Sequence, residues 1–272
     1  MRPASIETPP PLPPGLLPRL AAHHRIALFL DYDGTISEIT PDVSNAQPVE
    51  GAIEVIQRLS ARPDRFRVIL ISGRQIDKLA RLTGVSGGIT FVGNHGLEVM
   101  EPGRGSRLAA DPDRFMPALD RVRDWMAANV PPAAGFVIED KGFGVALHYR
   151  LAEPGLGAAM RRRMRDFVGA QTPALGIREG KMVIEAAPRE ANKGTAAMQL
   201  MRAAGDRYLA LYFGDDLTDE DAFFALRETG VSVKVCAQPC PSWARYRIAS
   251  PAEVVAELAR MAASVGTALP VQ

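Results

Sequence analysis

The sequence has little cysteine and almost no excess charge, and each shortage excludes a class of protein. Its 272 residues include only two cysteines, Cys236 and Cys240, too few for the disulfide framework of a small secreted domain. Their Cys-Ala-Gln-Pro-Cys spacing is not that of a paired zinc knuckle, and no second pair exists to complete the ligand set. We therefore expect a structural or incidental role for both thiols, in a reduced, cytoplasmic protein.

The charge balance and the hydropathy narrow the possible partners. The 32 basic and 31 acidic residues leave a formal charge of +1, which gives no electrostatic case for a nucleic-acid or membrane partner. No apolar run is long enough to span a bilayer, and the proline-rich N-terminus lacks the apolar block of a signal peptide. We expect a small-molecule partner, and the composition leaves the oligomeric state open.

Short apolar runs that alternate with helical patterns predict a parallel sheet. Five runs are typical of strands buried on both faces: residues 26–30, 66–71, 89–92, 208–213 and 231–235. Apolar residues at helical spacing lie between or after them, over 50–60, 75–82 and 252–264. This alternation predicts an α/β fold with a Rossmann-like parallel-sheet core and right-handed crossovers.

The alternation is interrupted between residues 108 and 187. This stretch predicts the order αββαββ, with helices near 113–128 and 156–169 and a hairpin signal at Lys-Gly-Phe-Gly. We interpret it as a small α+β domain inserted into a core of residues 21–107 and 188–272. A proline-rich tail over residues 1–20 precedes the core, and we expect it to be extended and loosely held.

Three of the predicted strands end in polar, potentially reactive side chains. These are Asp31 and Asp33 after the first strand, Ser72 after the second, and Asp215 with Asp216 after the fourth. Because the carboxyl ends of parallel strands line one crevice, we expect these groups to converge. For Asp216 and Asp219, turn and helix-cap chemistry is an equally open explanation.

So many carboxylates in one place require a cation. Hard oxygen ligands with no nearby His or Cys suit Mg²⁺, which also takes a phosphate oxygen, and we predict its ligands to be Asp31, Asp33 and Asp215. Lys193 stands in the first turn of a predicted helix, where the helix dipole disfavours a cation by about 0.3–1 kcal/mol. A bound phosphate or an ionised aspartate would explain a lysine there.

These side chains suffice for phosphoryl transfer through a covalent intermediate. As a hypothesis, Asp31 attacks phosphorus in line and forms an acyl-phosphate. Asp33 protonates the departing oxygen and then takes a proton from the hydrolytic water. Mg²⁺ and Lys193 offset negative charge, while Ser72 either helps to hold the phosphoryl oxygens or only ends its strand in a turn.

In order and spacing, four motifs resemble those of the haloacid dehalogenase superfamily of phosphatases. They are Asp31-Tyr-Asp-Gly-Thr35, Ser72-Gly-Arg74, Lys193 and Gly214-Asp-Asp216. The resemblance implies that Asp31 is the nucleophile, that Asp33 is the acid/base, and that Lys193 and Asp215 complete the site. It further implies substrate contacts for Gly34, Arg74 and His95 and supporting roles for Thr35, Asn94, Asp216 and Asp219. His95 could instead only order its Gly93-Asn-His-Gly96 turn.

Finer features are similar to the trehalose-6-phosphate phosphatases. They are the strings Gly214-Asp-Asp-Leu-Thr-Asp-Glu-Asp-Ala-Phe223 and Glu139-Asp-Lys-Gly-Phe-Gly-Val-Ala-Leu-His-Tyr-Arg150. The resemblance implies Mg²⁺-dependent hydrolysis of trehalose 6-phosphate to trehalose and inorganic phosphate, as in trehalose biosynthesis. The inserted domain is then a cap whose side chains read the sugar: Glu139, Lys141, His148, Arg150 and Glu185.

Several alternatives stay open. Along the predicted hairpin strands, Glu139 and Lys141 share a face, as do His148 and Arg150. These charges could instead pair with one another on an exposed face. A related phosphatase would act on sucrose phosphate or a glycosyl-phosphoglycerate, a phosphomutase would pass the phosphoryl group to another sugar hydroxyl, and a regulatory protein would lack activity.

Overall fold

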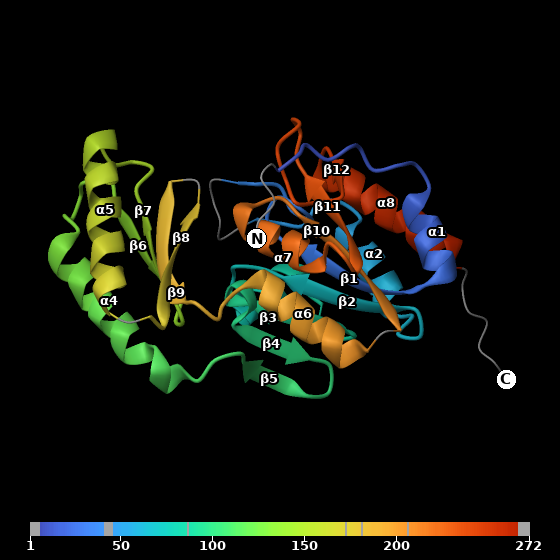
Figure 1. The fold of residues 1–272 in the computed structure, drawn as a ribbon, viewed down its shortest axis with the longest axis horizontal. Coiled ribbons are helices and arrows are strands. Elements are labelled where there is room, and N and C mark those ends of the chain that lie inside the picture. The colour runs from blue at the N-terminus through green and yellow to red at the C-terminus, as the bar shows by residue number, and fades with distance from the viewer. Residues whose placement is uncertain are drawn as a thin grey trace. The chain divides into compact units, whose positions relative to one another are not determined.

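The computed structural model describes residues 6–40, 46–85, 87–171, 173–180, 182–205 and 207–265. The chain forms two compact units: a core unit of Met1–Arg107 with Asn192–Gln272, and an inserted unit of Leu108–Ala191 (Figure 1). Each unit has its own sheet. The predicted fold class, a parallel-sheet α/β core with an inserted αββαββ domain, is confirmed.

Eight strands of the described residues form the sheet of the core unit. In spatial order they are β12 (Tyr246–Ile248), β11 (Gly230–Val235), β10 (Tyr208–Gly214), β1 (Arg25–Asp31), β2 (Phe66–Ile71), β3 (Ile89–Gly93), β4 (Glu98–Glu101) and β5 (Gly105–Leu108). Neighbours from β12 to β3 pair in parallel, and β4 pairs with β3 antiparallel. From β1 the chain builds the sheet in one direction through β2 to β5, and from β10 it builds the sheet in the other direction through β11 to β12. A topological switch point therefore lies between β1 and β10.

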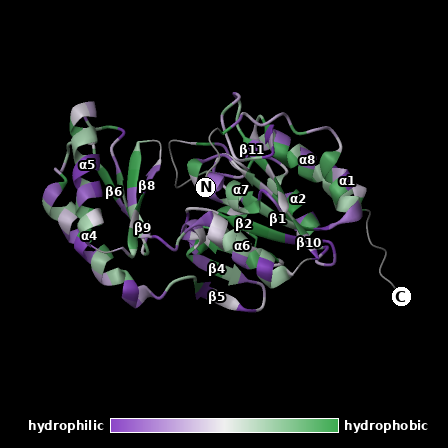
Figure 2. Cartoon of the chain, in the orientation of Figure 1, coloured by the Kyte–Doolittle hydropathy of each residue, from purple (hydrophilic) through white to green (hydrophobic). Residues whose placement is uncertain are grey.

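Helices pack on both faces of this sheet. The first face packs against α1 (Leu16–His23), α2 (Ala52–Ser60), α3 (Ile76–Thr83) and α8 (Pro251–Ser264). The second packs against α6 (Lys193–Ala204) and α7 (Leu217–Leu226). Along β1, Leu28 and Leu30 lie in the first cluster and Phe29 in the second, so alternation directs Asp31 to the side of α6 and α7. Figure 2 shows the hydrophobic colour along these central strands.

The described part of the proline-rich tail is bound to the core unit, so the expectation of a loosely held tail is wrong there. The N–H of Leu12 donates to the carbonyl oxygen of Arg247 (2.8 Å), and the N–H of Arg247 donates to that of Pro10 (2.9 Å). The tail thus extends the sheet at the edge strand β12, where proline is tolerated. Helix α1, which the sequence pattern did not predict, buries Leu17 completely. Residues 1–5 lie outside the described residues.

After the short helix η3 (Pro112–Arg114), the described part of the inserted unit has two α-helices and four strands in the predicted order. They are α4 (Met116–Asn129), β6 (Val137–Asp140), β7 (Val145–His148), α5 (Pro154–Gln171), β8 (Leu175–Gly180) and β9 (Val183–Pro188). The strands form an antiparallel sheet in the order β6-β7-β9-β8. Helices α4 and α5 pack on this sheet, and side chains such as Leu147 and Ile184 are fully buried. Lys181, where we expected the last strand to begin, lies outside the described residues.

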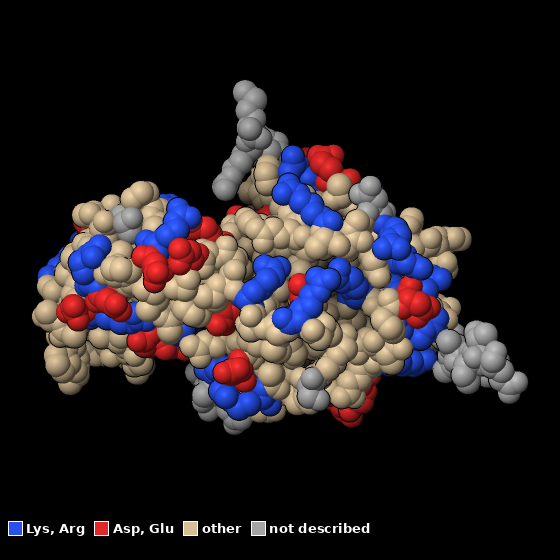
Figure 3. Space-filling view, turned by 90° about the horizontal axis from the view of Figure 1, so that it is seen from below, with Lys and Arg blue, Asp and Glu red and all other residues tan. Residues whose placement is uncertain are grey.

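The surface carries charges of both signs. Figure 3 shows basic and acidic side chains in small separate groups on the face that it draws, with neither sign covering it. Within the described ranges, no helix combines the length and the apolar character that crossing a membrane requires.

Candidate active site

The register of the core sheet brings three strand ends together. Leu30 of β1 pairs with Phe213 of β10, and Asp31 pairs with Ile71 of β2. The residues that follow these partners are Gly214 and Asp215 on one side of β1 and Ser72 on the other. The polar groups therefore meet at the switch point, where ligands bind in open α/β sheets.

Lys193 is the first residue of α6, and its ammonium group lies between two carboxylates. Its Nζ donates to Oδ1 of Asp31 (2.6 Å) and to Oδ1 of Asp219 (2.8 Å). All three side chains are buried. Burial alone would lower the pKa of Lys193, but Asp219 and Asp31 raise it above its ordinary value, so the lysine stays charged. These two anions explain a cation in the first turn of a helix, which the dipole alone disfavours.

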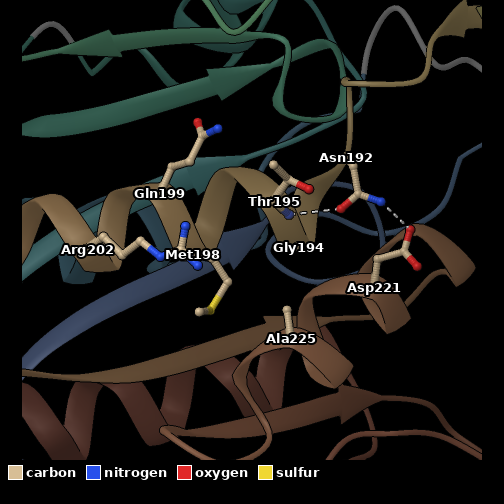
Figure 4. Close-up of a pocket in the computed structure, with 8 residues that line it drawn as sticks. All are labelled: Asn192, Gly194, Thr195, Met198, Gln199, Arg202, Asp221 and Ala225. Carbon is tan, nitrogen blue, oxygen red and sulfur yellow. Dashed lines mark hydrogen bonds between the residues drawn. The ribbon is translucent and has the colours of Figure 1, made fainter. Parts of the chain in front are cut away.

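The starts of α6 and α7 are tied together on their outer side (Figure 4). Oδ1 of Asn192 accepts from the N–H of Thr195 (2.9 Å) and so caps α6, while its Nδ2 donates to Oδ2 of Asp221 on α7 (2.7 Å). A Cβ at Gly194 would overlap the carbonyl group of Asp221, so only glycine allows this approach. Lys193 directly follows Asn192, and Asp219 precedes Asp221 by two residues. The link therefore fixes the position of Lys193 relative to Asp219.

A groove of about 330 Å³ opens on this outer side (Figure 4). Its lining consists of Asn192, Gly194, Thr195, Met198, Gln199, Arg202, Asp221 and Ala225. None of the predicted catalytic carboxylates is among them, so the groove is separate from the candidate active site.

Three carboxylates of the core unit form a group that could hold a metal ion. Asp31, Asp215 and Asp219 each place one oxygen within 4.8 Å of the others. Burial raises the pKa of Asp31 well above its usual range; Lys193 opposes this rise, while Asp219 and Asp215 add to it. Burial and then Asp219 raise the pKa of Asp215 to about 7. Within the described residues, Oδ1 of Asp215 is buried without a hydrogen-bond partner. An oxygen-seeking divalent cation would satisfy this atom and favour the charged carboxylates.

The carboxylate of Asp33 lies outside this group and pairs with Arg74. The guanidinium of Arg74 donates through Nε to Oδ2 (2.8 Å) and through Nη2 to Oδ1 (2.5 Å), a bidentate pair. Asp33 is partly exposed, whereas Arg74 is buried. The metal-ligand role expected for Asp33 and the substrate contact expected for Arg74 therefore stay predictions, and the structure adds a contact between the two that the sequence did not predict.

Ser72 and His95 lie side by side at the ends of β2 and β3. Oγ of Ser72 accepts from the N–H of Arg74 (3.1 Å), so the serine does end its strand in a turn. The N–H of His95 donates to the carbonyl oxygen of Ser72 (2.9 Å), and a Cβ at Gly73 would overlap the His95 ring. In the short helix η2 (Asn94–Gly96), Asn94 and His95 have φ of 47° and 56°. Residues other than glycine seldom adopt this left-handed backbone, although Asn and His do so more often than most, and it is concentrated at functional sites.

The turn after β1 also leaves a polar atom without a partner. Thr35 is fully buried, and its Oγ1 makes no hydrogen bond to any described residue. Oγ1 of Thr218, at the start of α7, is in the same state. Buried hydroxyls normally have a partner, so both atoms fit a site built to take water or an anionic ligand.

In the inserted unit, one face of the sheet carries most of the side chains expected to read a sugar. Glu139 lies opposite Ala146, which lies opposite Glu185, so all three share a face. Nε2 of His148 lies 3.0 Å from Oε2 of Glu139, and Nζ of Lys141 lies 2.6 Å from Oε2 of Glu185. The contact of Glu139 with His148 is the pairing considered as the alternative, whereas Lys141, one residue beyond the end of β6, pairs with the buried Glu185.

Two arginines of the inserted unit differ from expectation. Strand β7 ends at His148 and Arg150 lies in the following turn, so the predicted strand face shared by His148 and Arg150 is wrong. Arg178 was missed: it lies opposite Glu185 across β8 and β9, with Nη1 3.7 Å from Oε1 of Glu185. Its guanidinium also donates to the carbonyl oxygens of Pro188 and Ala191. Only strand pairing reveals this neighbour, and pairing is not visible in the sequence.

Known proteins resemble this chain over most of its length. The trehalose-phosphatase family model matches residues 29–252. "Probable trehalose-phosphate phosphatase G" of Arabidopsis thaliana is 30% identical over 260 residues, which cover 86% of this chain and 68% of that protein. "Trehalose-phosphate phosphatase" of Mycobacterium avium is 35% identical over 213 residues, which cover 76% of this chain and 53% of that protein. The chain thus spans about half to two thirds of the length of these two relatives.

A solved structure has a similar fold. The C-terminal domain of C. albicans trehalose-6-phosphate phosphatase superposes with a TM-score of 0.82 at 25% sequence identity. The match covers 95% of this chain and 99% of that chain.

Proposed function

The chain belongs to the trehalose-phosphatase family, and from this premise we propose that it hydrolyses trehalose 6-phosphate to trehalose and inorganic phosphate. The observation that carries the proposal is the buried contact of Lys193 with Asp31 at the end of β1, beside Asp215 at the end of β10. A buried lysine beside several carboxylates provides a nucleophile, an oxygen-rich cation site and a positive charge for a phosphoryl group.

The first half of the reaction transfers the phosphoryl group to Asp31. A carboxylate oxygen of Asp31 attacks phosphorus, an acyl-phosphate bond forms, and the bond from phosphorus to the sugar oxygen breaks. Asp33 gives its proton to the departing sugar oxygen, which leaves as a hydroxyl group. Arg74 donates two hydrogen bonds to the carboxylate form of Asp33, the form that acts as the base in the second half of the reaction.

The second half returns Asp31 to its starting state. Asp33 takes a proton from water, the resulting hydroxide attacks phosphorus, and the bond between phosphorus and Asp31 breaks to release phosphate. Lys193 carries a positive charge 2.6 Å from Asp31 and stabilises negative charge on the nucleophile and on the phosphoryl oxygens. Ser72 lies at the neighbouring strand end, where its hydroxyl can donate to a phosphoryl oxygen.

The metal proposed for this site is Mg²⁺, held by Asp31 and Asp215, with Asp33 as the further ligand expected from the sequence. When bound, Mg²⁺ offsets the negative charges of carboxylate and phosphate that otherwise oppose their approach. The buried, unpartnered Oδ1 of Asp215, among the described residues, supports this assignment.

The polar face of the inserted sheet supplies sugar recognition. Carboxylates of Glu139 and Glu185 accept hydrogen bonds from sugar hydroxyls, while Lys141 and His148 donate to hydroxyl oxygens. The contacts of His148 with Glu139 and of Lys141 with Glu185 orient these groups before substrate arrives. Arg150, beyond the end of β7, is an additional donor expected from the sequence. A cytoplasmic location also stays a prediction of the sequence.

Phosphate release from a panel of substrates tests the proposal. The panel consists of trehalose 6-phosphate, sucrose 6-phosphate, glucosyl-3-phosphoglycerate and glucose 6-phosphate, each with Mg²⁺ and with EDTA, and without a sugar-bisphosphate activator. We expect metal-dependent release with strong preference for trehalose 6-phosphate. Preference for another member would replace the substrate, dependence on a bisphosphate activator would indicate a mutase, and no turnover at all would indicate a regulatory protein.

A further inference from the structure

A buried tyrosine forms a hydrogen bond with a carboxylate of the candidate active site. The hydroxyl of Tyr212, on β10, donates to Oδ1 of Asp219 (2.8 Å). The same oxygen accepts from Nζ of Lys193 (2.8 Å), and Oδ2 of Asp219 accepts from the N–H of Asp216 (3.0 Å). Three donors therefore hold the carboxylate of Asp219.

The ring of Tyr212 is fixed by its surroundings. The side chain is fully buried, stacked on Phe29 with ring centroids 5.8 Å apart and met edge-on by Phe223 at 5.5 Å. Phe29 precedes Asp31 by two residues on the same face of β1, so the stacked aromatic rings lie next to the carboxylates of the candidate active site. In this apolar setting the phenolic hydroxyl needs an acceptor, and Asp219 provides it.

Asp219 and Asp215 differ in how much of each carboxylate is still available. Both belong to the acidic group that could hold a metal. Oδ1 of Asp215 is buried without a partner among the described residues, so it can bind a cation. Both oxygens of Asp219 already accept hydrogen bonds: Oδ1 accepts from Lys193 and Tyr212, and Oδ2 accepts from the N–H of Asp216.

We propose that Tyr212 is a positioning residue that commits Asp219 to holding Lys193 and keeps Asp219 from serving as a metal ligand. This inference rests on the proposed phosphatase activity, in which Lys193 stabilises the phosphoryl group. The hydroxyl of Tyr212 fixes Oδ1, the Asp216 N–H fixes Oδ2, and the carboxylate then presents one defined site to the lysine. Tyr212 itself touches neither substrate nor metal.

Substitution Tyr212→Phe tests this role because it removes only the hydroxyl and keeps the aromatic stack. Tyr208→Phe is the matched control: Tyr208 lies on the same strand and the same face, four positions toward the start of β10, away from the site. Each variant is assayed for kcat and KM on trehalose 6-phosphate and on p-nitrophenyl phosphate. Mg²⁺ binding is measured separately by calorimetry without substrate, and thermal unfolding checks that each variant folds.

For Tyr212→Phe we expect kcat to fall about tenfold on both substrates with KM within about twofold, because the lysine acts in the transition state. We expect Mg²⁺ affinity to be equal to or higher than that of the wild type, since Asp219 is freed to approach the metal. Tyr208→Phe should match the wild type in all three quantities.

Three results would overturn the inference: unchanged kcat in Tyr212→Phe, an equal fall in both variants, or weaker Mg²⁺ binding that accounts for the lost activity. If the wild type hydrolyses p-nitrophenyl phosphate but not trehalose 6-phosphate, the proposed substrate is wrong. The test of Tyr212 can then still be made on p-nitrophenyl phosphate.

Discussion

Gly34 lies directly against the carboxylate of Asp215, so that a Cβ at position 34 would overlap it. The backbone of Gly34 has a φ of 78°, in the left-handed region that glycine adopts at no steric cost. The turn after β1 and the carboxylate after β10 thus pack directly against each other, although about 180 residues separate them in the chain.

Substitution Gly34→Ala is expected to damage the metal site more than the fold. The added methyl group must displace Asp215, so the Mg²⁺ concentration for half-maximal activity should rise about tenfold or more. Gly84→Ala is the matched control, because Gly84 has a φ of 63° but no atom within 4 Å of the added Cβ. Both variants should lose about 1 kcal/mol of stability from the strained backbone. Equal Mg²⁺ requirements in the two variants would contradict the contact.

The stability of the metal-free protein should decrease as pH rises from about 4 to about 7. Burial raises the pKa of Asp215 from 3.8 to about 7, so the folded state binds this proton more tightly than the unfolded chain. The stability that this proton contributes is complete below the unfolded pKa and lost as pH rises through the folded pKa. The slope from one group is at most about 1.4 kcal/mol per pH unit.

Urea unfolding between pH 4 and pH 8, with and without Mg²⁺, measures this effect. Because the cation binds the charged carboxylates, Mg²⁺ should stabilise the protein more at pH 8 than at pH 5. In Asp215→Asn the pH slope of the metal-free protein should become shallower. An unchanged slope in this variant would assign the titration to another group.

Recognition of the sugar should depend on the polar face of the inserted sheet. Glu185→Gln keeps the shape of the side chain but removes its negative charge. The carboxylate that pairs with Lys141 and accepts hydrogen bonds from hydroxyl groups is thereby replaced by an amide. We expect KM for trehalose 6-phosphate to rise about tenfold, with p-nitrophenyl phosphate turnover unchanged. Asp140→Asn is the control: Asp140 lies on β6 of the same sheet, its carboxylate pairs with Arg123, and its substitution should leave both quantities unchanged. A loss of activity on both substrates in Glu185→Gln would argue against a role in sugar recognition.

Buried strands and the order of the inserted elements could be predicted because their signals are local. The run 66–71 coincides with β2, and the αββαββ order follows from periodicity and turn residues. Helix α1 and the attachment of Leu12 to Arg247 could not be predicted, because a proline-rich segment has the same local signature whether it is free or paired with a sheet edge.

The carboxylates at strand ends could also be predicted, because parallel strands deliver their ends to one edge. The partners of these groups could not. Arg74 pairs with Asp33 and Tyr212 holds Asp219 through contacts that depend on side-chain direction in the folded protein. Tyr212 lies in the apolar run over 208–213, so the sequence pattern predicts only an ordinary core residue. The role of its hydroxyl group becomes apparent only when its hydrogen-bond acceptor is known.

The phosphorylated enzyme itself tests the central claim most directly. Trehalose 6-phosphate labelled in its phosphoryl group is mixed with the wild type and with Asp31→Asn in the presence of Mg²⁺, and the reactions are stopped with acid within a single turnover. We predict acid-stable label on the wild-type protein that maps to Asp31, and neither bound label nor released phosphate from the folded variant. Phosphate release by Asp31→Asn at the wild-type rate, or label on another residue, would contradict the account.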